Sequence, residues 1–575
     1  MTSKASIRPY LNQAYLLGLL MVAVGLTLSP FLMGMSQFWL VIVWFVDALT
    51  PPFKGAGGIK TKLSRFFHNK AAVLLVAFYL MHVVGLLWTS DFQYALKDLR
   101  VKLPILVMPF VLSSMEPLDR KRFNIVMLIY VLSVFIATQF SFVSYMRHEY
   151  EDIREISHFI SHIRFCLNIV FCIAIIGRYL YNRGVSTLST AGSTALGKQA
   201  PELAVPEAHR RVEGPSQVKY PVPAFGVKRA IDRFLQWFLL LWFIYQIYIF
   251  ESLSGYVILA AVVIASAVYA FLQWKRGRGW RIAIGLFAVG AIAALVVVVM
   301  SAVKPLIEVK PVDFSTLEKK TAQGNYYWHD TVCFPVEDGK YVGLYFNRNE
   351  LREAWSMRSN MPFEGTTTNG ENLETTLARY LTSKDLRKDA EGVMALTDED
   401  IRNIEQGVAN YNNWKHPGIH ARLSSTLFEY NLYRRFNNPN GGSLAQRIEF
   451  SMASLHIIKQ YPWFGVGTGD VPQAFAQTYD EIHSPLKEEF RFRAHNQYLA
   501  IAVAFGLVGL AFFVFVLFYP WFASKRNHTY LYMVFLTIML LSMFPEDTLE
   551  TQAGATLFAF FVSLLLFASP VSRQK

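Results

Sequence analysis

The stretch 495–520, HNQYLAIAVAFGLVGLAFFVFVLFYP, places one histidine at the mouth of a long apolar run. The run from Tyr498 to Tyr519 is long enough to cross a bilayer as a helix. His495 is therefore expected where membrane meets water, and an imidazole there can take or give a proton near neutral pH. The GLVG segment at 506–509 predicts a face that another helix approaches closely. The plainer interpretation is an interfacial histidine above a small-residue packing face.

Composition indicates a polytopic membrane protein. Hydrophobic residues make up 53% of the 575 residues, which is too apolar for one soluble core of this length. We count about twelve runs of spanning or nearly spanning length. They lie near 13–29, 31–49, 71–88, 102–114, 123–146, 163–181, 234–250, 255–273, 281–302, 497–520, 529–544 and 552–570.

The charge pattern orients these spans. If the runs alternate across the membrane, basic loops around 54–70, 120–122, 275–281 and 525–526 fall on one side together with both termini. The positive-inside rule assigns that side to the cytoplasm. The net charge of +13 is then a topology signal, and we expect no nucleic-acid partner.

Two long segments interrupt the spans. Residues 182–232 are rich in Ser, Thr, Ala, Pro and Gly, which predicts a flexible cytoplasmic linker. Residues 303–495 carry helical patterns and scattered aromatics, which predicts a folded, mainly helical domain on the opposite, periplasmic side. The transmembrane helices then occupy 1–181, 233–302 and 496–575. The predicted fold class is an all-α polytopic membrane protein.

A cation near a predicted helix start is the first chemical signal outside the spans. Ser443 and Gln446 have the spacing of a capping pair, and Arg447 follows in the first turns. The helix dipole disfavours a cation there by up to about 1 kcal/mol. Arg447 is either solvated, or paired with Glu429 or Glu449, or it forms a phosphate site together with the helix start.

Three glycines follow that helix at alternate positions in the stretch 461–469, YPWFGVGTG. Gly465, Gly467 and Gly469 let the backbone turn tightly or approach a ligand closely. The pattern is a weak signal for a phosphate-binding loop, and an ordinary turn explains it equally well.

Further cations are predicted on the outer face of the membrane. Arg164 begins a span from that face, where it either snorkels or has an anionic partner. Arg100 lies in an outer loop with Lys97 and Lys102. Outer cations run against the orientation rule, and a lipid-borne diphosphate would explain them.

Three acidic residues, Glu546, Asp547 and Glu550, follow the eleventh predicted span. They suit a metal site or a carboxylate base, but no histidine is nearby in the sequence. We favour helix capping and pairing with the outer arginines, and we predict no metal.

The order of these motifs is similar to that of a known family. Arg447, the 462–469 stretch, the His495-Asn496 pair and the 506–509 segment together resemble the O-antigen ligase and polymerase superfamily of bacterial envelope glycosyltransferases. The resemblance implies twelve spans, with a large periplasmic loop before the tenth. It also implies a bacterial inner (cytoplasmic) membrane location.

The resemblance implies a reaction as well. Family ligases join a glycan carried on undecaprenyl diphosphate to lipid A core, without a nucleotide sugar, a metal or another cofactor. His495 matches the family histidine and Arg447 one family arginine, so both are candidate catalytic residues. The second family arginine follows Ser in a Ser-Arg-x-Gly stretch, where this chain has Leu253. Arg164 is the candidate replacement.

The sequence also offers candidate substrate-binding residues and alternative functions. Arg100, Asn496 and the three glycines Gly465, Gly467 and Gly469 are candidate substrate-binding residues. An O-antigen polymerase or a protein oligosaccharyltransferase would use the same donor with another acceptor. A secondary transporter or lipid-linked glycan flippase also suits many spans, although the charges gather at one face and no inverted repeat is evident.

Overall fold

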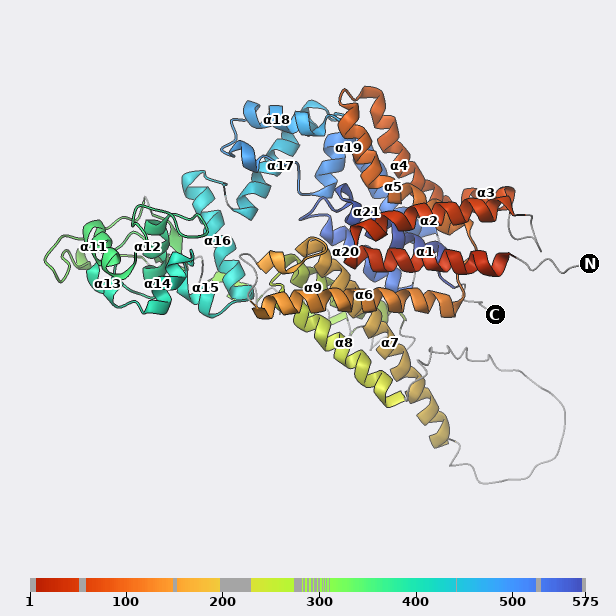
Figure 1. Cartoon of the computed structure of the whole chain (residues 1–575), viewed down its shortest axis with the longest axis horizontal. Coiled ribbons are helices and arrows are strands. Elements are labelled where there is room, and N and C mark those ends of the chain that lie inside the picture. The colour runs from red at the N-terminus through yellow and green to blue at the C-terminus, as the bar shows by residue number, and fades with distance from the viewer. Residues whose placement is uncertain are drawn as a thin grey trace, which may run out of the picture.

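The chain is mainly helical, as predicted. The computed structural model describes residues 7–50, 58–147, 153–196, 229–273, 311–332, 334–440, 442–523 and 529–570, with isolated positions between 282 and 309. In these residues the only ladder of regular strands is the short antiparallel pair β1 (Val336–Glu337) and β2 (Lys340–Tyr341). Figure 1 shows a bundle of long helices with a separate group of short helices at one end.

Among the described residues, seven helices are long and apolar enough to cross a membrane. They are α1 (Arg8–Leu28), α2 (Pro30–Leu49), α4 with η1 (Lys70–Trp88), α6 (Arg120–Arg147), α7 (His162–Leu196) as far as Tyr181, α9 (Leu253–Gln273) as far as Phe271, and α19 (Gln497–Ala523). Shorter apolar helices are α20 (Tyr530–Ser542) and the stretch Gln552–Ala568, which begins with α21 (Gln552–Ser563). The count of twelve stays a prediction, because the expected span at 281–302 is described only at isolated positions.

Three further helices belong to this bundle: α3 (Ile59–His68), α5 (Phe92–Ser114) and α8 (Arg229–Ile249). Helix α7 (His162–Leu196) runs past its apolar part into the segment predicted to be a linker, and 197–228 lies outside the described residues. The start of α1 and the basic helix α3 lie at the end of the bundle opposite the short helices (Figure 1). The assignment of this end to the cytoplasm stays a prediction from the charge pattern.

The predicted outer domain, 303–495, is divided between two hydrophobic cores. One core, around Trp355 and Leu377, belongs to a unit of short helices. These are α11 (Arg348–Arg358), α12 (Leu373–Ser383), α13 (Ala390–Met394), α14 (Asp398–Glu405) and α15 (Tyr411–Lys415). Phe450 of α17 (Ser443–Gln460) and Phe475 of α18 (Val471–Glu481) belong instead to the core of the membrane part. Helix α16 (Ile419–Phe436) lies between the two parts (Figure 1).

The GLVG segment interrupts α19 and binds a loop. Gly506 has φ +66° and ψ −169°, a conformation that is nearly exclusive to glycine. The loop between α17 and α18 pairs with the break on both sides. The Val466 amide donates to the Val503 carbonyl at 3.0 Å, and the Leu507 amide donates to the Pro462 carbonyl at 2.8 Å. The partner at this glycine is therefore a loop, because backbone groups freed by the break need hydrogen bonds.

The predicted close helix approach occurs one turn later. A Cβ added at Gly509 would lie 3.5 Å from the sulfur of Met81 on α4. Helices α4 and α19 pack together there. The small-residue segment thus contacts a loop at Gly506 and a helix at Gly509.

Substituting Gly506 by Ala should destabilise the fold by about 2 kcal/mol or more, because the backbone conformation is strained for any Cβ. That Cβ would also lie 2.3 Å from the carbonyl carbon of Trp463. We expect a lower Tm in thermal unfolding of the detergent-purified protein. Gly177→Ala in α7 is the control, because a Cβ there meets nothing within 4 Å. Equal Tm values for the two variants would contradict the account of the break.

Candidate functional site

Three side chains proposed from the sequence meet at one acidic pair. Glu546 and Asp547 lie in the turn between α20 and η6 (Thr548–Glu550). Arg447 Nη2 on α17 lies 3.1 Å from Glu546 Oε1, and Arg164 Nη2 at the start of α7 lies 3.9 Å from its Oε2. His495 Nδ1 lies 3.8 Å from Asp547 Oδ1. Segments far apart in the chain therefore supply one cluster.

The turn before α19 positions His495. Asn496 caps the helix: its Oδ1 accepts from the Leu499 amide at 3.0 Å and its Nδ2 donates to the Phe544 carbonyl at 3.0 Å. The neighbouring imidazole packs on the ring of Phe450, with ring centroids 5.4 Å apart. Asn496 thus has a structural task next to the histidine, and both of its amide atoms are used for it.

The His495 ring combines a buried and an open side. Its side chain is 35% exposed, whereas Nδ1 is buried without a hydrogen-bond partner among the described residues. Burial lowers the pKa of His495 below its ordinary value, and neighbouring arginines lower it further, although Glu546 opposes the shift. The neutral imidazole, which can accept a proton, is therefore the favoured form near pH 7.

A carboxylate already occupies the start of α17. The N-cap is Gly442, and the Ser443 side chain makes no capping hydrogen bond, so the predicted capping pair is wrong. Glu429 of α16 packs against Gly442 at the helix start. Burial raises the pKa of Glu429, and the nearby backbone amides of Leu444 and Ser443 oppose that rise. A helix N-terminus attracts one anion, and here the protein supplies it. Arg447 pairs with Glu546, away from that helix start.

The three glycines pack against other backbone segments. A Cβ at Gly465 would lie 2.4 Å from the carbonyl carbon of Ala504, and one at Gly469 would lie 2.5 Å from Thr89 Cγ2. The Gly467 amide donates to the Ala504 carbonyl at 2.9 Å, and the Gly469 amide to Thr89 Oγ1 at 3.1 Å. These amides are engaged within the protein, so close packing explains the glycine pattern.

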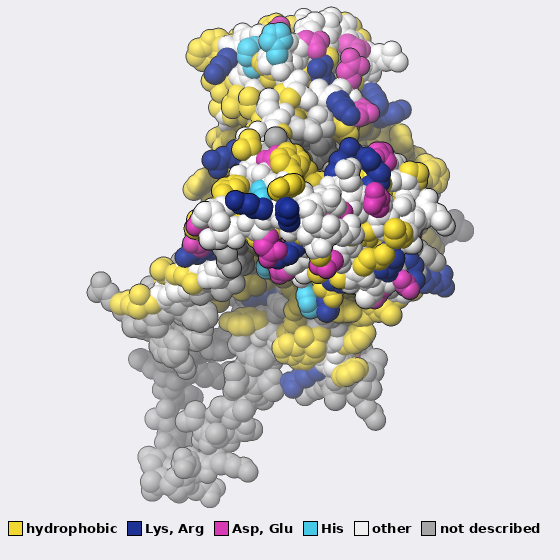
Figure 2. All heavy atoms as spheres, turned by 90° about the vertical axis from the view of Figure 1, so that its left-hand side faces the viewer, with side chains coloured by type: hydrophobic (Ala, Val, Ile, Leu, Met, Phe, Trp, Pro, Cys, Tyr) yellow, Lys and Arg dark blue, Asp and Glu magenta, His cyan; other side chains and the backbone are white. Residues whose placement is uncertain are grey.

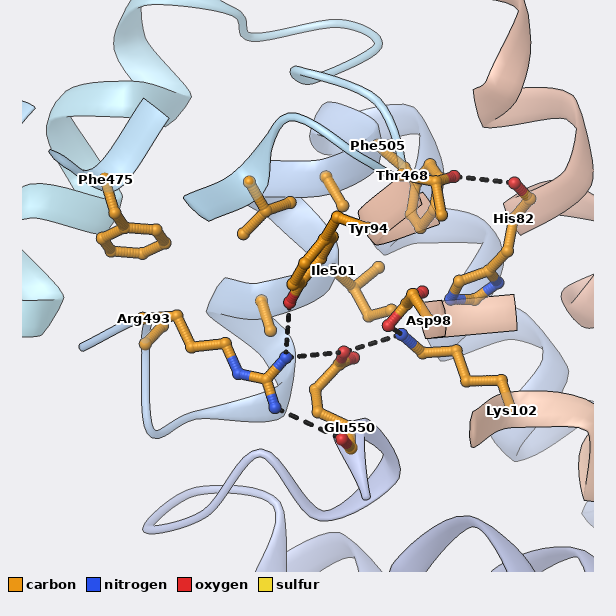
Figure 3. A pocket seen from close by; sticks show the side chains of 14 residues that line it. His82, Tyr94, Asp98, Lys102, Thr468, Phe475, Arg493, Ile501, Phe505 and Glu550 are labelled. Carbon is orange, nitrogen blue, oxygen red and sulfur yellow. Dashed lines mark hydrogen bonds and ion pairs between the residues drawn. The ribbon is translucent and has the colours of Figure 1, made fainter. Parts of the chain in front are cut away.

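Arg100 lies away from the charged cluster, whereas Lys102 lies next to the cluster. Arg100 is exposed on α5 and has no ion pair with the cluster in the described part of the chain. Lys102 is 2% exposed and bonds Asp98 at 2.5 Å and Glu550 at 2.6 Å (Figure 3). Two of the predicted outer cations therefore differ: Arg100 is solvated, whereas Lys102 is buried in ion pairs.

Arg493 is a member of the site that the sequence analysis missed. Its Nε lies 2.8 Å from Asp547 Oδ2, and its Nη1 lies 3.5 Å from Glu550 Oε2. Nη1 also donates to the Tyr94 hydroxyl at 3.0 Å (Figure 3). Positions 493 and 495 alternate along a non-helical segment, so they share a side, and that spacing was the available signal.

The three acidic residues pair with arginines and with Lys102, so the predicted pairing is confirmed. The predicted capping is not, because Asp547 precedes η6 without a side-chain capping hydrogen bond. Burial raises the pKa of Asp547 to about 6, although Arg493 opposes the rise, and burial also raises the pKa of Glu546. For Glu550, Lys102 and Arg493 outweigh burial, and the pKa is lowered. Among these three acidic residues, Glu550 is therefore firmly ionised, whereas Glu546 and Asp547 gain a proton more easily.

His495, Glu546 and Asp547 are the one described group with metal-ligand atoms close together, all within 4.8 Å of one another. The two carboxylates already contact Arg164, Arg447 and Arg493. Two like unit charges 4 Å apart repel by about 4 kcal/mol at an effective dielectric constant of 20, and a divalent ion doubles that figure. Three guanidinium groups therefore make the site a poor fit for a metal ion.

Comparison with known proteins identifies one segment. Residues 411–514 match the family model described as O-antigen ligase. The segment runs from α15 into α19 and contains Arg447, the three glycines and His495. No curated protein sequence matches the chain. The match supports the resemblance carried by the motifs: residues 411–514 are similar to the O-antigen ligase family.

Proposed function

We propose that this protein is an O-antigen ligase. It transfers a glycan from undecaprenyl diphosphate to lipid A core at the periplasmic face of the inner membrane. The observation that carries the proposal is the convergence of Arg164, Arg447 and His495 on Glu546 and Asp547. An activated sugar needs a proton acceptor and cations for the departing diphosphate, and this cluster supplies both.

The proposed reaction is a single displacement at C1 of the donor sugar. The acceptor hydroxyl oxygen forms a bond to C1 while the bond from C1 to the diphosphate oxygen breaks. The hydroxyl proton passes to the His495 imidazole, and the electron pair of the broken bond leaves with the diphosphate. Arg447 and Arg164 stabilise the charge that develops on this leaving group. The donor bond supplies the free energy of transfer, so no nucleotide is needed.

Asp547 suits the role of a positioning residue for His495. With a proton on Nδ1 facing Asp547, the other ring nitrogen is the base. The imidazolium formed during transfer is then stabilised by a carboxylate 3.8 Å away. Arg493 in turn holds Asp547 through a 2.8 Å contact, which fixes the carboxylate toward the histidine.

Glu546 pairs with the two arginines that the proposed reaction uses. Both guanidinium groups approach its carboxylate, at 3.1 and 3.9 Å. A diphosphate has more charge than a carboxylate and more oxygens for a bidentate fork, so it competes well for the same arginines. Glu546 then gains a proton more easily than an exposed glutamate, because burial raises its pKa.

Replacing His495 by Ala removes the proposed base, so transfer should fall by about 10²-fold or more. The readout is the envelope glycolipid pattern of a deletion strain that carries the variant at wild-type protein level. Core lipid without polymer indicates a ligase, and core with one repeat unit indicates a polymerase. His456→Ala is the control, since that residue pairs with Glu481 on an exposed face. Normal polymer attachment in the His495→Ala strain rejects the catalytic assignment.

Arg164 should behave as the second family arginine. Arg164→Ala is expected to reduce transfer as strongly as Arg447→Ala, by about 10² to 10³-fold for one lost electrostatic donor. Leu253 begins α9, and a Cβ at Gly255 would lie 3.5 Å from Cys166, two residues after Arg164. Leu253→Arg should therefore partly restore transfer in the Arg164→Ala protein.

The exposed Arg434 provides the control for the arginine series, as Arg434→Ala. Arg447→Lys should also transfer poorly, because a point charge cannot form a bidentate fork. Wild-type transfer by Arg164→Ala would leave position 164 as a structural ion pair.

Transfer by the purified protein should survive EDTA, because guanidinium groups take the place of a divalent ion at the diphosphate. The assay measures glycan joined to lipid A core before and after chelation. Loss of transfer that magnesium or manganese restores would instead assign a metal to His495, Glu546 and Asp547, whose ligand atoms lie within 4.8 Å.

A further inference from the structure

The outer domain contains a polar groove that the proposed reaction does not use. The groove runs between the segment before α12, helix α12, helix α15 and helix α16. Its lining includes Asn369, Glu371, Arg379, Asn413, Trp414 and Ser425. Planar amide, carboxylate and guanidinium groups thus stand beside one large aromatic ring. A concave site with a few placed polar groups is typical of small-ligand recognition.

The floor of the groove is held rigidly. Arg379 makes a bidentate pair with Glu337, with contacts of 2.8 and 2.9 Å, and its guanidinium lies 3.8 Å from the ring centroid of Phe428. Asn410 Nδ2 donates to Glu337 at 3.0 Å and to Asp338 at 2.9 Å. These partners fix the polar side chains in advance, which lowers the entropy cost of binding.

The rim of the groove, in contrast, presents groups that are open to a ligand. Glu371 and Asn369 are exposed, and in the described part of the chain the Glu371 carboxylate has no hydrogen-bond partner. Trp414 is 40% exposed, and its ring lies 6.2 Å from that of Tyr411. The Asn369 side-chain oxygen accepts from the Thr367 hydroxyl at 2.7 Å, so Glu371 offers the free carboxylate on this rim. An amphipathic ring and a free carboxylate together suit a ligand with both C–H faces and hydroxyl groups.

The charges of the groove narrow the class of ligand. Glu337 neutralises Arg379, so the lining offers no free cation for a phosphate or a nucleic acid. Figure 2 shows acidic and basic side chains interspersed over the end of the molecule that the outer domain forms. The lining is more polar than a lipid or apolar peptide site would be. A polyhydroxylated ligand fits the groove best.

One helix joins this groove to the charged site. Ser425 and Tyr433 both lie on α16, eight residues and therefore about 12 Å apart along the axis. The Tyr433 hydroxyl donates at 2.6 Å to Glu449 of α17, the helix that also carries Arg447. Helices α16 and α17 therefore connect the groove to the element that carries Arg447.

We propose that this groove binds an oligosaccharide segment of a substrate glycan at a distance from the reacting sugar. The inference rests on the proposed function for the source of the glycan, whereas the recognition chemistry rests on the groove alone. The sugar chain belongs to the donor or to the acceptor core, and both have the same chemistry. Trp414 stacks on a sugar face, and Glu371 accepts hydrogen bonds from hydroxyl groups.

The test measures binding to the full-length protein in lipid nanodiscs. The probes are lipid-free polysaccharide and core oligosaccharide, both released by mild acid from lipopolysaccharide of the source strain. Trp414→Ala and Glu371→Gln should each weaken binding about five- to tenfold, the loss expected for an aromatic contact or a charged hydrogen bond. Trp328→Ala is the matched control, because Trp328 is exposed in the same domain outside the groove. Polysaccharide binding assigns the groove to the donor, and core binding assigns it to the acceptor.

The two groove variants should also raise KM for glycan transfer while kcat changes little. The proposal is overturned if the wild-type protein binds neither probe, or if both variants bind as well as Trp328→Ala. The binding assay is repeated in His495→Ala protein, which separates the two proposals. Retained binding without transfer supports both of them. Normal transfer by His495→Ala together with weaker binding by Trp414→Ala rejects only the catalytic assignment.

Discussion

Charges held at a membrane face must be neutralised by opposite charges, and the row Glu546, Asp547 and Glu550 meets that requirement. An unpaired buried charge costs several kcal/mol, so each carboxylate fixes the segment whose cation it binds. Glu546 binds α7 and α17, Asp547 binds the segment before α19, and Glu550 binds that segment and α5. One short acidic turn therefore ties together four segments that are distant in the sequence, and the candidate site exists only where they meet.

This balance of charge also determines which ligands suit the site. Cations that are already paired do not attract every passing anion, since a ligand must outcompete a carboxylate placed within the protein. A diphosphate meets that condition through its charge and its several oxygens. A divalent metal ion suits the site poorly, because it would have to displace the arginines from the carboxylates that they already bind. The neutral imidazole of His495 fits this arrangement, since burial and the surrounding arginines both disfavour its protonation.

Sequence reasoning succeeded where a residue breaks a local rule and failed where a distant partner decides its role. Arg164 and Arg447 were found because a cation is costly at those positions, and the structure supplies a shared carboxylate. Glu429 was only one of several possible partners for Arg447, because its place at the start of α17 depends on how α16 packs. The alternation of Gly467 with its neighbours predicted a close approach, and only the fold shows that the approaching group is backbone. The helical class followed from composition alone, whereas the count of twelve spans stays a prediction, because apolar length does not reveal which runs form single helices.

The division of the outer segment into two cores separates two physical tasks. Helices α17 and α18 share a core with the membrane part, so Arg447 is as fixed as the spans that surround it. The unit from α11 to α15 has its own core, and its groove can therefore change in sequence without moving the charged cluster. Helix α16 connects them, because its Tyr433 bonds to α17 and its Glu429 packs at the start of that helix. A rigid connection of this kind keeps a fixed distance between the groove and the acidic turn. Under the proposed function, that distance would select the length of sugar chain that reaches both places.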